Sequence, residues 1–183
     1  MTQIVEDLLT LSRLEARDRL DAEPVAMAPM LLALGREGRA LSQGRHDIAI
    51  EDSAGCDLYG SPGELHSAFS NLVGNAVRYT PEGGRIRVRW RADADGSLLL
   101  EVEDSGHGIP AQHLPRLTER FYRVSSSRSR ESGGTGLGLS IVKHVLHLHE
   151  ARLEIESEPG RGSVFRCRFD SSRALPRGHD DTA

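Results

Sequence analysis

Residues 134–140 read Gly134-Thr-Gly-Leu-Gly-Leu-Ser140. Three glycines alternate with small or apolar residues, and apolar residues at helical spacing follow directly. A glycine-rich turn that leads into a helix lets backbone N–H groups approach a phosphate, and the helix dipole favours negative charge there. The turn lacks the Lys-Ser/Thr pair of a P-loop. By itself it predicts either a phosphate-binding loop or only a tight connection.

A helix predicted from residue 61 to about residue 79 carries polar residues on one face. It begins at Ser61-Pro-Gly-Glu64, which has the pattern of a capping box with proline in the first turn. Asn71, Asn75 and Arg78 recur at helical spacing beside an apolar stripe. Amide oxygens suit Mg²⁺ beside nucleotide phosphates, although two satisfied surface amides would give the same pattern. Tyr79 could stack on a base or close the core.

A second polar segment, Asp104-Ser-Gly-His-Gly108-Ile109, follows a predicted strand. A carboxylate at the end of a strand can accept a hydrogen bond from an exocyclic amine such as the adenine N6 group, and glycines let a planar ring approach the backbone. An ordinary Asp-rich turn is the alternative. Residues 111–133 then contain five arginines and little periodicity, which favours a functional lid over a core segment.

The remaining pattern alternates between helices and strands and predicts an α/β fold. A helix is expected over residues 29–42, a short strand over 47–51, and two hairpins over 85–102 and 152–169. Residues 2–17 form an amphipathic pattern wide enough to face another helix, so they predict either part of a helical hairpin or a helix packed on its own domain. The polar residues 171–183 predict a frayed tail.

Composition excludes several classes of protein. The chain has 183 residues, a net charge of −4, 38% hydrophobic and 27% charged residues, and two distant cysteines. These values predict a soluble globular chain without a disulfide framework, and no general basic patch indicates nucleic-acid binding. No run of 18 apolar residues is present.

Together, the motifs resemble those of sensor histidine kinases. Residues 71–81 are similar to the N box of that family, 104–108 to its G1 box, 119–123 to its F box, 134–139 to its G2 box, and 160–163 to its last glycine motif. The five motifs occur in the family's order within residues 24–169. The wider superfamily includes DNA gyrase, Hsp90 and MutL, which generally carry glutamate where this chain has Asn71, so the kinase branch is favoured. Residues 1–20 and 61–130 are most similar to phosphate-regulon sensor kinases.

The resemblance implies a fold and a division of the chain. The fold is a two-layer α/β sandwich with a mixed sheet of about five strands, three main helices on one face, and an N-terminal stem helix. Residues 1–20 would be the end of the second dimerisation helix, 21–170 the catalytic ATP-binding domain, and 171–183 a disordered tail.

The resemblance also implies roles for individual residues. ATP would lie between the helix that carries Asn71 and Asn75 and the lid, with Mg²⁺ held by these two amides. Asn71 and Arg123 would be catalytic, Asp104 would bind adenine N6, and catalysis would consist of positioning and charge neutralisation. The implied ATP-binding residues are Asn71, Asn75, Arg78, Tyr79, Asp104, Gly106, Gly108, Ile109, Phe121, Tyr122, Arg123, Gly134, Thr135, Gly136, Leu137, Gly138 and Leu139.

The partners follow from the same resemblance. None of the eight histidines lies in a phosphoacceptor motif, so the acceptor histidine is expected on a dimerisation domain outside this chain, with a response regulator receiving the phosphoryl group. The full-length protein would be a membrane-bound homodimer with this domain on the cytoplasmic side of the inner membrane, whereas the present chain alone would be monomeric or weakly dimeric. A nucleotide-binding regulatory module without phosphotransfer is the alternative function.

Two details concern the helix after the G2 box. Glu150-Ala151 replaces the family's Gly-Gly, which removes the easy left-handed end of that helix. His144, His147 and His149 are expected on its exposed face.

Overall fold

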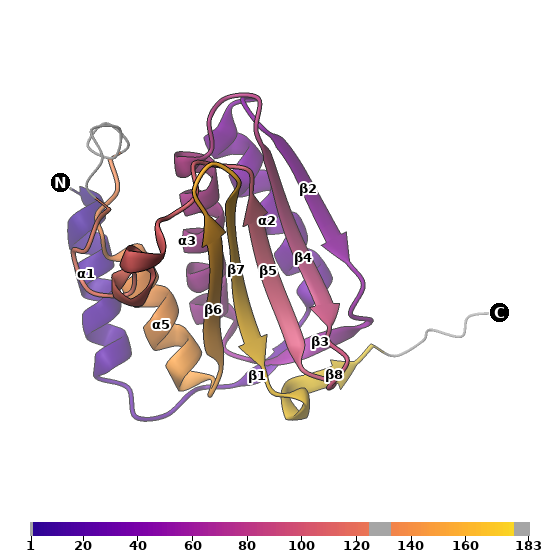
Figure 1. Ribbon diagram of the computed structural model, residues 1–183. Coiled ribbons are helices and arrows are strands. Elements are labelled where there is room, and N and C mark those ends of the chain that lie inside the picture. The colour runs from indigo at the N-terminus through magenta and orange to yellow at the C-terminus, as the bar shows by residue number, and fades with distance from the viewer. Residues whose placement is uncertain (1, 125–132, 178–183) are drawn as a thin grey trace.

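A five-stranded mixed sheet forms one layer of the protein (Figure 1). The computed structural model describes residues 2–124 and 133–177. In this part of the chain the order of the large sheet is β2 (Asp47–Asp52), β4 (Arg85–Ala92), β5 (Leu98–Asp104), β7 (Gly162–Phe169) and β6 (Arg152–Glu158). Strands β2 and β4 are parallel, and the other neighbours are antiparallel. The predicted mixed sheet is confirmed.

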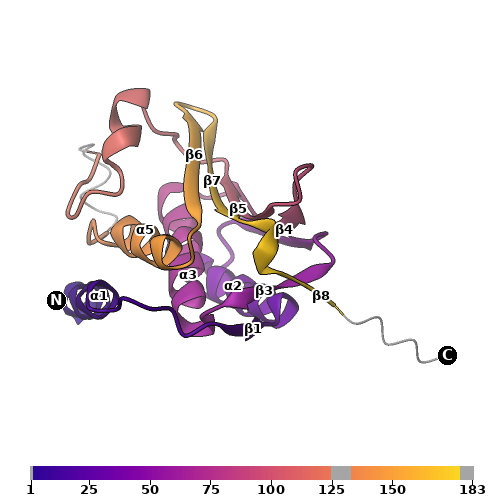
Figure 2. The ribbon, with the colours of Figure 1, turned by 90° about the horizontal axis from the view of Figure 1, so that it is seen from below.

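Three helices cover one face of this sheet (Figures 1 and 2). They are α2 (Met27–Ser42), α3 (Pro62–Tyr79) and α5 (Gly138–Leu148). Alternate residues of β4 explain this layering, because Ile86, Val88 and Trp90 are fully buried beneath the helices. Phe169 on β7 packs edge-on against Trp90 with ring centroids 6.4 Å apart. The predicted two-layer α/β sandwich is therefore confirmed.

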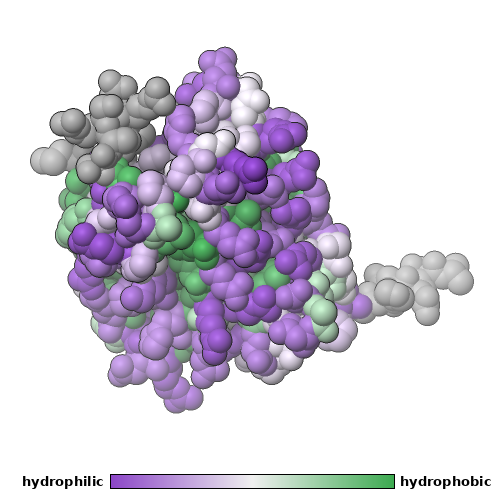
Figure 3. Space-filling view, in the orientation of Figure 1, coloured by the Kyte–Doolittle hydropathy of each residue, from purple (hydrophilic) through white to green (hydrophobic). Residues whose placement is uncertain are grey.

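The opposite face of the sheet is charged, and hydrophilic residues predominate on it in Figure 3. Glu101 lies at its centre with only 3% of its surface exposed. Its carboxylate accepts hydrogen bonds from Arg91 on β4 and from Arg166 on β7. Burial alone would raise the pKa of Glu101, but these two arginines hold it below its ordinary value. The ion pairs thus tie three strands together on the face that the helices leave open.

A small second sheet joins distant parts of the chain. Strand β3 (Cys56–Gly60) pairs with β1 (Glu23–Val25) on one side and with β8 (Ala174–Pro176) on the other. A short 3₁₀ helix, η2 (Ser171–Arg173), leads into β8. The predicted disordered tail is therefore wrong for residues 171–177, because strand pairing and the ion pairs of Arg177 with Asp52 and Asp57 hold them. Residues 178–183 lie outside the described part of the chain.

Helix α1 (Thr2–Glu15) packs side by side with α5 at one edge of the domain (Figures 1 and 2). Leu11 and Leu14 are buried in this contact. The rest of its apolar stripe remains exposed, and it comprises Ile4, Val5, Leu8 and Leu9. The helix therefore packs on its own domain, as one of the two sequence-based alternatives predicts, and its other side is exposed. Within residues 2–124 and 133–177, no helix has the length and apolar character needed to cross a membrane.

The start of α3 differs from the predicted capping box. Pro62 begins the helix as expected, but the Ser61 side chain makes no capping hydrogen bond. Glu64 instead forms an ion pair with Arg17, just after α1. The Ser61 backbone N–H donates to Nε2 of His149 at 3.0 Å. A side chain from the far end of α5 thus replaces the local cap.

His149 corrects a second expectation, because its ring is fully buried and not exposed. Its Nδ1 donates to the Val145 carbonyl at 2.7 Å, which leaves Nε2 as the acceptor for Ser61. Burial lowers the pKa of His149 below its ordinary value. Glu150 follows with a left-handed φ of 54°, so the helix keeps a left-handed end without glycine.

Candidate nucleotide site

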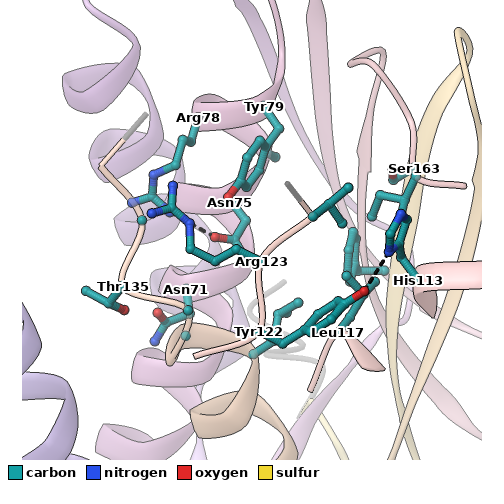
Figure 4. Close-up of a pocket in the computed structure, with 18 of the residues that line it drawn as sticks. Asn71, Asn75, Arg78, Tyr79, His113, Leu117, Tyr122, Arg123, Thr135 and Ser163 are labelled. Atoms are coloured by element: carbon teal, nitrogen blue, oxygen red, sulfur yellow. Dashed lines mark hydrogen bonds between the residues drawn. The ribbon is translucent and has the colours of Figure 1, made fainter. Parts of the chain in front are cut away.

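A cavity of about 540 Å³ lies between α3, the segment that follows β5, and the glycine-rich turn before α5 (Figure 4). Most of the predicted site residues line it. They are Asn71, Asn75, Arg78, Tyr79, Asp104, Gly108, Ile109, Tyr122, Arg123, Gly134, Thr135, Gly136, Gly138 and Leu139. Its volume lies in the range typical of sites for small molecules and cofactors. Residues from distant parts of the sequence are thus brought to one hollow.

Three predicted residues do not line the cavity. Leu137 is fully buried in the core, and Gly106 is buried under the Asp104 carboxylate. Phe121 is 58% exposed and has a left-handed φ of 61°. A bulky residue rarely adopts this conformation, which costs about 1–2 kcal/mol. The structure therefore places these residues around the site and not on its wall.

The amides of α3 face the cavity as the helical spacing predicts. The Asn71 Nδ2 donates to the Ser67 carbonyl at 2.8 Å, which leaves its Oδ1 on the side of Gly138. A Cβ added at Gly138 would lie 2.7 Å from that oxygen. The Asn75 Oδ1 instead accepts from Nη1 of Arg78 at 3.0 Å. One amide oxygen is therefore turned to the glycine-rich turn, and the other is held by the neighbouring guanidinium.

Asp104, the last residue of β5, also lines the cavity. Only 8% of its surface is exposed, and its Oδ1 accepts from the Gly106 backbone N–H at 2.8 Å. Burial raises the pKa of Asp104 to about 6, although hydrogen bonds from the Gly106 and Ser163 backbone partly oppose this effect. Such a carboxyl group can accept a hydrogen bond from a ligand amine when ionised.

The glycine-rich turn has the geometry that its sequence requires. Gly136 has a φ of 75°, and a Cβ there would lie 2.8 Å from the Phe121 Cα. The Phe121 N–H donates to the Gly136 carbonyl at 2.9 Å. Thr135 Oγ1 accepts from the Leu137 N–H at 3.2 Å, just ahead of α5. Glycine is needed at residue 136 both for its backbone angle and for this close approach.

The predicted lid, residues 111–133, is described as far as residue 124 and again at residue 133. It begins with the 3₁₀ helix η1 (Ala111–Arg116). His113 Nδ1 and the Tyr122 hydroxyl lie 2.6 Å apart (Figure 4). The Arg116 guanidinium stacks on the Tyr122 ring, 4.3 Å from the ring centroid. The rest of the predicted lid, residues 125–132, lies outside the described part of the chain.

Several cavity residues were missed by the sequence interpretation. His113, Ser163 and Phe165 line the part of the cavity near η1 and β7. Gln3 and Asp7 come from α1. Ser163 belongs to the last glycine motif and could have been found from it. The contact of α1 with the glycine-rich turn could not be predicted, because the two segments are far apart in the sequence and share no local pattern.

Residues 60–173 match the family described as histidine kinase-, DNA gyrase B- and HSP90-like ATPase. The chain belongs to this family. It is 55% identical over 171 residues to the phosphate regulon sensor protein PhoR of Pseudomonas aeruginosa, covering 92% of this chain and 38% of that protein. It is 36% identical over 167 residues to the sensor-like histidine kinase SenX3 of Mycolicibacterium smegmatis, covering 90% and 43%. The chain thus spans about two fifths of the curated relatives that it matches, and the predicted resemblance to phosphate-regulon sensor kinases is confirmed.

Solved structures agree with this assignment. The mycobacterial sensor histidine kinase MprB matches with a TM-score of 0.72 at 26% identity, over 85% of this chain and 99% of that one. Full-length ShkA in complex with AMPPNP matches with a TM-score of 0.81 at 24% identity, over 96% and 36%. These similarities show that the ATPase domain of this chain has the fold of histidine kinase catalytic domains.

Proposed function

We propose that this chain is the ATP-binding catalytic module of a two-component sensor histidine kinase that responds to phosphate. The observation that carries the proposal is that the amides of α3, Asp104 and the glycine-rich turn all line one cavity. The proposal that the kinase responds to phosphate is supported by the similarity to a phosphate regulon sensor protein, which extends over 92% of this chain.

Adenine binds at the end of the cavity formed by Asp104 and Ile109. The ionised Asp104 carboxylate accepts a hydrogen bond from the exocyclic N6 amine. Its other hydrogen bonds come from backbone N–H groups, so the carboxylate is already oriented before the base arrives. Ile109 packs partly against the core and offers an apolar surface to the ring.

The phosphates lie between α3 and the start of α5. The backbone around Gly136 and Gly138 presents N–H groups there, and the helix N-terminus favours their negative charge. Arg78 and Arg123 line the same cavity and neutralise further charge. Phe121 and Leu137 shape this backbone through their hydrogen bonds with Gly136 and Thr135. Gly106 acts at the other part of the site, where its N–H holds the Asp104 carboxylate.

The amides of α3 fit a magnesium ion because Asn71 already turns its oxygen toward the turn. Asn75 fits after one exchange, in which Arg78 leaves the Asn75 oxygen and binds a phosphate. The bound ion would neutralise phosphate charge and orient the γ-phosphoryl group. When Arg78 binds a phosphate, the Asn75 oxygen thus becomes available to the ion.

Phosphoryl transfer then depends on positioning and charge neutralisation by Asn71 and Arg123. The nucleophile is the imidazole of a histidine on a dimerisation domain, and the phosphoryl group passes from there to a response regulator. The exposed stripe of α1 supports this partner, because Ile4, Val5 and Leu9 present apolar surface beside the domain. In the whole receptor, we place this module on the cytoplasmic side of the inner membrane in a homodimer.

The test mixes the chain with Mg-[γ-³²P]ATP and a separately made dimerisation domain that carries the acceptor histidine. Labelling of that domain is the expected result. Nucleotide binding without label transfer would instead favour the alternative, a regulatory module that does not phosphorylate its partner. Absence of nucleotide binding would refute both.

A second arm tests the metal ligand. Asn75→Asp is expected to abolish Mg-ATP-dependent labelling while the thermal unfolding midpoint stays close to that of the parent chain. Gln112→Glu is the matched control, because it makes the same amide-to-acid change on an exposed residue outside the cavity. Equal labelling by the two variants would remove Asn75 from the metal site.

A further inference from the structure

Helix α1 contributes a carboxylate to the cavity. Asp7 is only 7% exposed, and both of its oxygens are engaged. Oδ2 accepts from the Thr135 hydroxyl at 2.7 Å, and Oδ1 accepts from Gln3 Nε2 at 2.9 Å. Among the described cavity residues, Asp7 and Asp104 are the two carboxylates. Asp104 has a role at the adenine end, whereas Asp7 has none in the function proposed above.

The Asp7 carboxylate lies beside the turn at which the phosphates of a bound nucleotide are placed in the proposed function. Its partner Thr135 belongs to the glycine-rich turn, and the Thr135 oxygen in turn accepts from the Leu137 N–H ahead of α5. A phosphate bound at this turn would therefore meet a buried negative charge already hydrogen-bonded to the same turn. Like charges at short range in a partly buried site repel strongly.

The other contacts of α1 show that this carboxylate is held in place. Leu11 and Leu14 are buried against the domain. Glu15, at the end of α1, forms an ion pair with Arg120, and its carboxylate lies 3.6 Å from Nε2 of His144 on α5. Helix α1 is thus attached to chain segments on both sides of residues 121–134. Moving α1 would move Asp7 relative to the turn.

We propose that Asp7 determines nucleotide affinity, with its carboxylate and the nucleotide phosphates competing for the Thr135 turn. The inference rests on the proposed nucleotide site and adds a residue that the motifs do not include. Because binding free energies are reciprocal, a nucleotide that disfavours the Asp7–Thr135 contact also weakens the docking of α1, and undocking of α1 strengthens nucleotide binding. The position of α1 and the occupancy of the site are thereby coupled.

The test compares Asp7→Asn with Glu6→Gln in the complete 183-residue chain. Both variants remove one negative charge from α1, but Glu6 is exposed and outside the cavity. The amide introduced by Asp7→Asn keeps an oxygen that can accept from Thr135, so the helix remains docked. Calorimetry with Mg-AMPPNP is expected to show about tenfold tighter binding for Asp7→Asn, about 1.4 kcal/mol, and less than twofold change for Glu6→Gln.

A neutral ligand separates charge from shape. Adenosine carries no phosphate, so Asp7→Asn should leave its affinity within twofold of the parent value. Hydrogen exchange supplies a second readout: Mg-AMPPNP should speed exchange of the α1 amides in the parent chain, and adenosine should not.

The outcomes are distinct. Equal Mg-AMPPNP affinity for the two variants, weaker binding by Asp7→Asn, or an equal gain for adenosine would each overturn the proposed competition. Failure of the parent chain to bind Mg-AMPPNP at all would instead count against the nucleotide site itself.

Discussion

Replacing Asp104 with asparagine should make the protein more stable at neutral pH. Burial raises the pKa of Asp104 from 3.8 to about 6. This difference of about 2.2 pKa units corresponds to about 3 kcal/mol, at 1.36 kcal/mol per unit, by which the folded state disfavours the ionised carboxyl group. The oxygen of the substituted amide can still accept from the Gly106 N–H, but its NH₂ group needs a partner. We therefore expect a gain of about 1–2 kcal/mol at pH 8.

The pH dependence gives a sharper test than the gain itself. Since the folded pKa is above the unfolded one, protonation of Asp104 stabilises the parent chain as the pH falls below about 6. Between pH 8 and pH 5 this contribution amounts to about 1.4 kcal/mol, and Asp104→Asn lacks it. The stability difference between the two proteins should therefore shrink by about 1.4 kcal/mol over that range. Other titrating groups are present in both proteins and cancel.

Urea unfolding followed by fluorescence measures this difference, because the chain has one tryptophan, and Trp90 is fully buried. Asp47→Asn is the control, since Asp47 is an exposed residue at the start of β2. A stability difference for Asp104→Asn that stays constant from pH 8 to pH 5 would refute the raised pKa. A loss of stability at pH 8 would refute the cost assigned to burial of the carboxylate.

Three further predictions concern stability and are measured by the same urea unfolding. Glu101→Gln should lower the free energy of unfolding by about 2–4 kcal/mol, because it breaks a buried ion-pair network, whereas Glu156→Gln on the exposed rim should cost less than about 1 kcal/mol. Glu150→Gly should raise the free energy of unfolding by about 1 kcal/mol, since its left-handed φ of 54° favours glycine, and an unchanged value would contradict this. The lowered pKa of His149 means that the neutral ring contributes stability that is present above about pH 6.5 and is lost as the pH falls below it. His149→Phe should remove this acid sensitivity but cost about 1–3 kcal/mol at pH 8, because the Ser61 N–H loses its acceptor; acid sensitivity equal to that of the parent would contradict the assignment.

The main layers of the fold could be predicted because their residues carry a strong local pattern. Strict alternation at Ile86, Val88 and Trp90 marks a strand with one buried face, and the structure buries all three. The helical spacing of Asn71 and Asn75 likewise places both beside one cavity. In these elements, periodicity and burial agree.

The remainder depends on contacts between distant residues. Strands β1 and β8 have three residues each and exist because β3 lies between them. The helical pattern alone predicts that His149 is exposed, but the start of α3 packs over its ring. Asp7 and Thr135 are 128 positions apart, and no local pattern joins them. Such contacts are decided by how the layers pack.

Measuring both stability and nucleotide affinity distinguishes residues of this domain that serve the binding site from residues that serve the fold. Asp104 is buried as a carboxyl group, and Phe121 holds a left-handed backbone with an exposed ring, so both are unfavourable in the folded state. Such states persist where the surrounding structure imposes them, and they cluster at functional sites. His149 is the opposite case, because it is fully satisfied and does not line the cavity. Variants at Asp104 should therefore gain stability while losing adenine recognition, whereas variants at His149 should lose stability and leave the affinity of the folded protein unchanged.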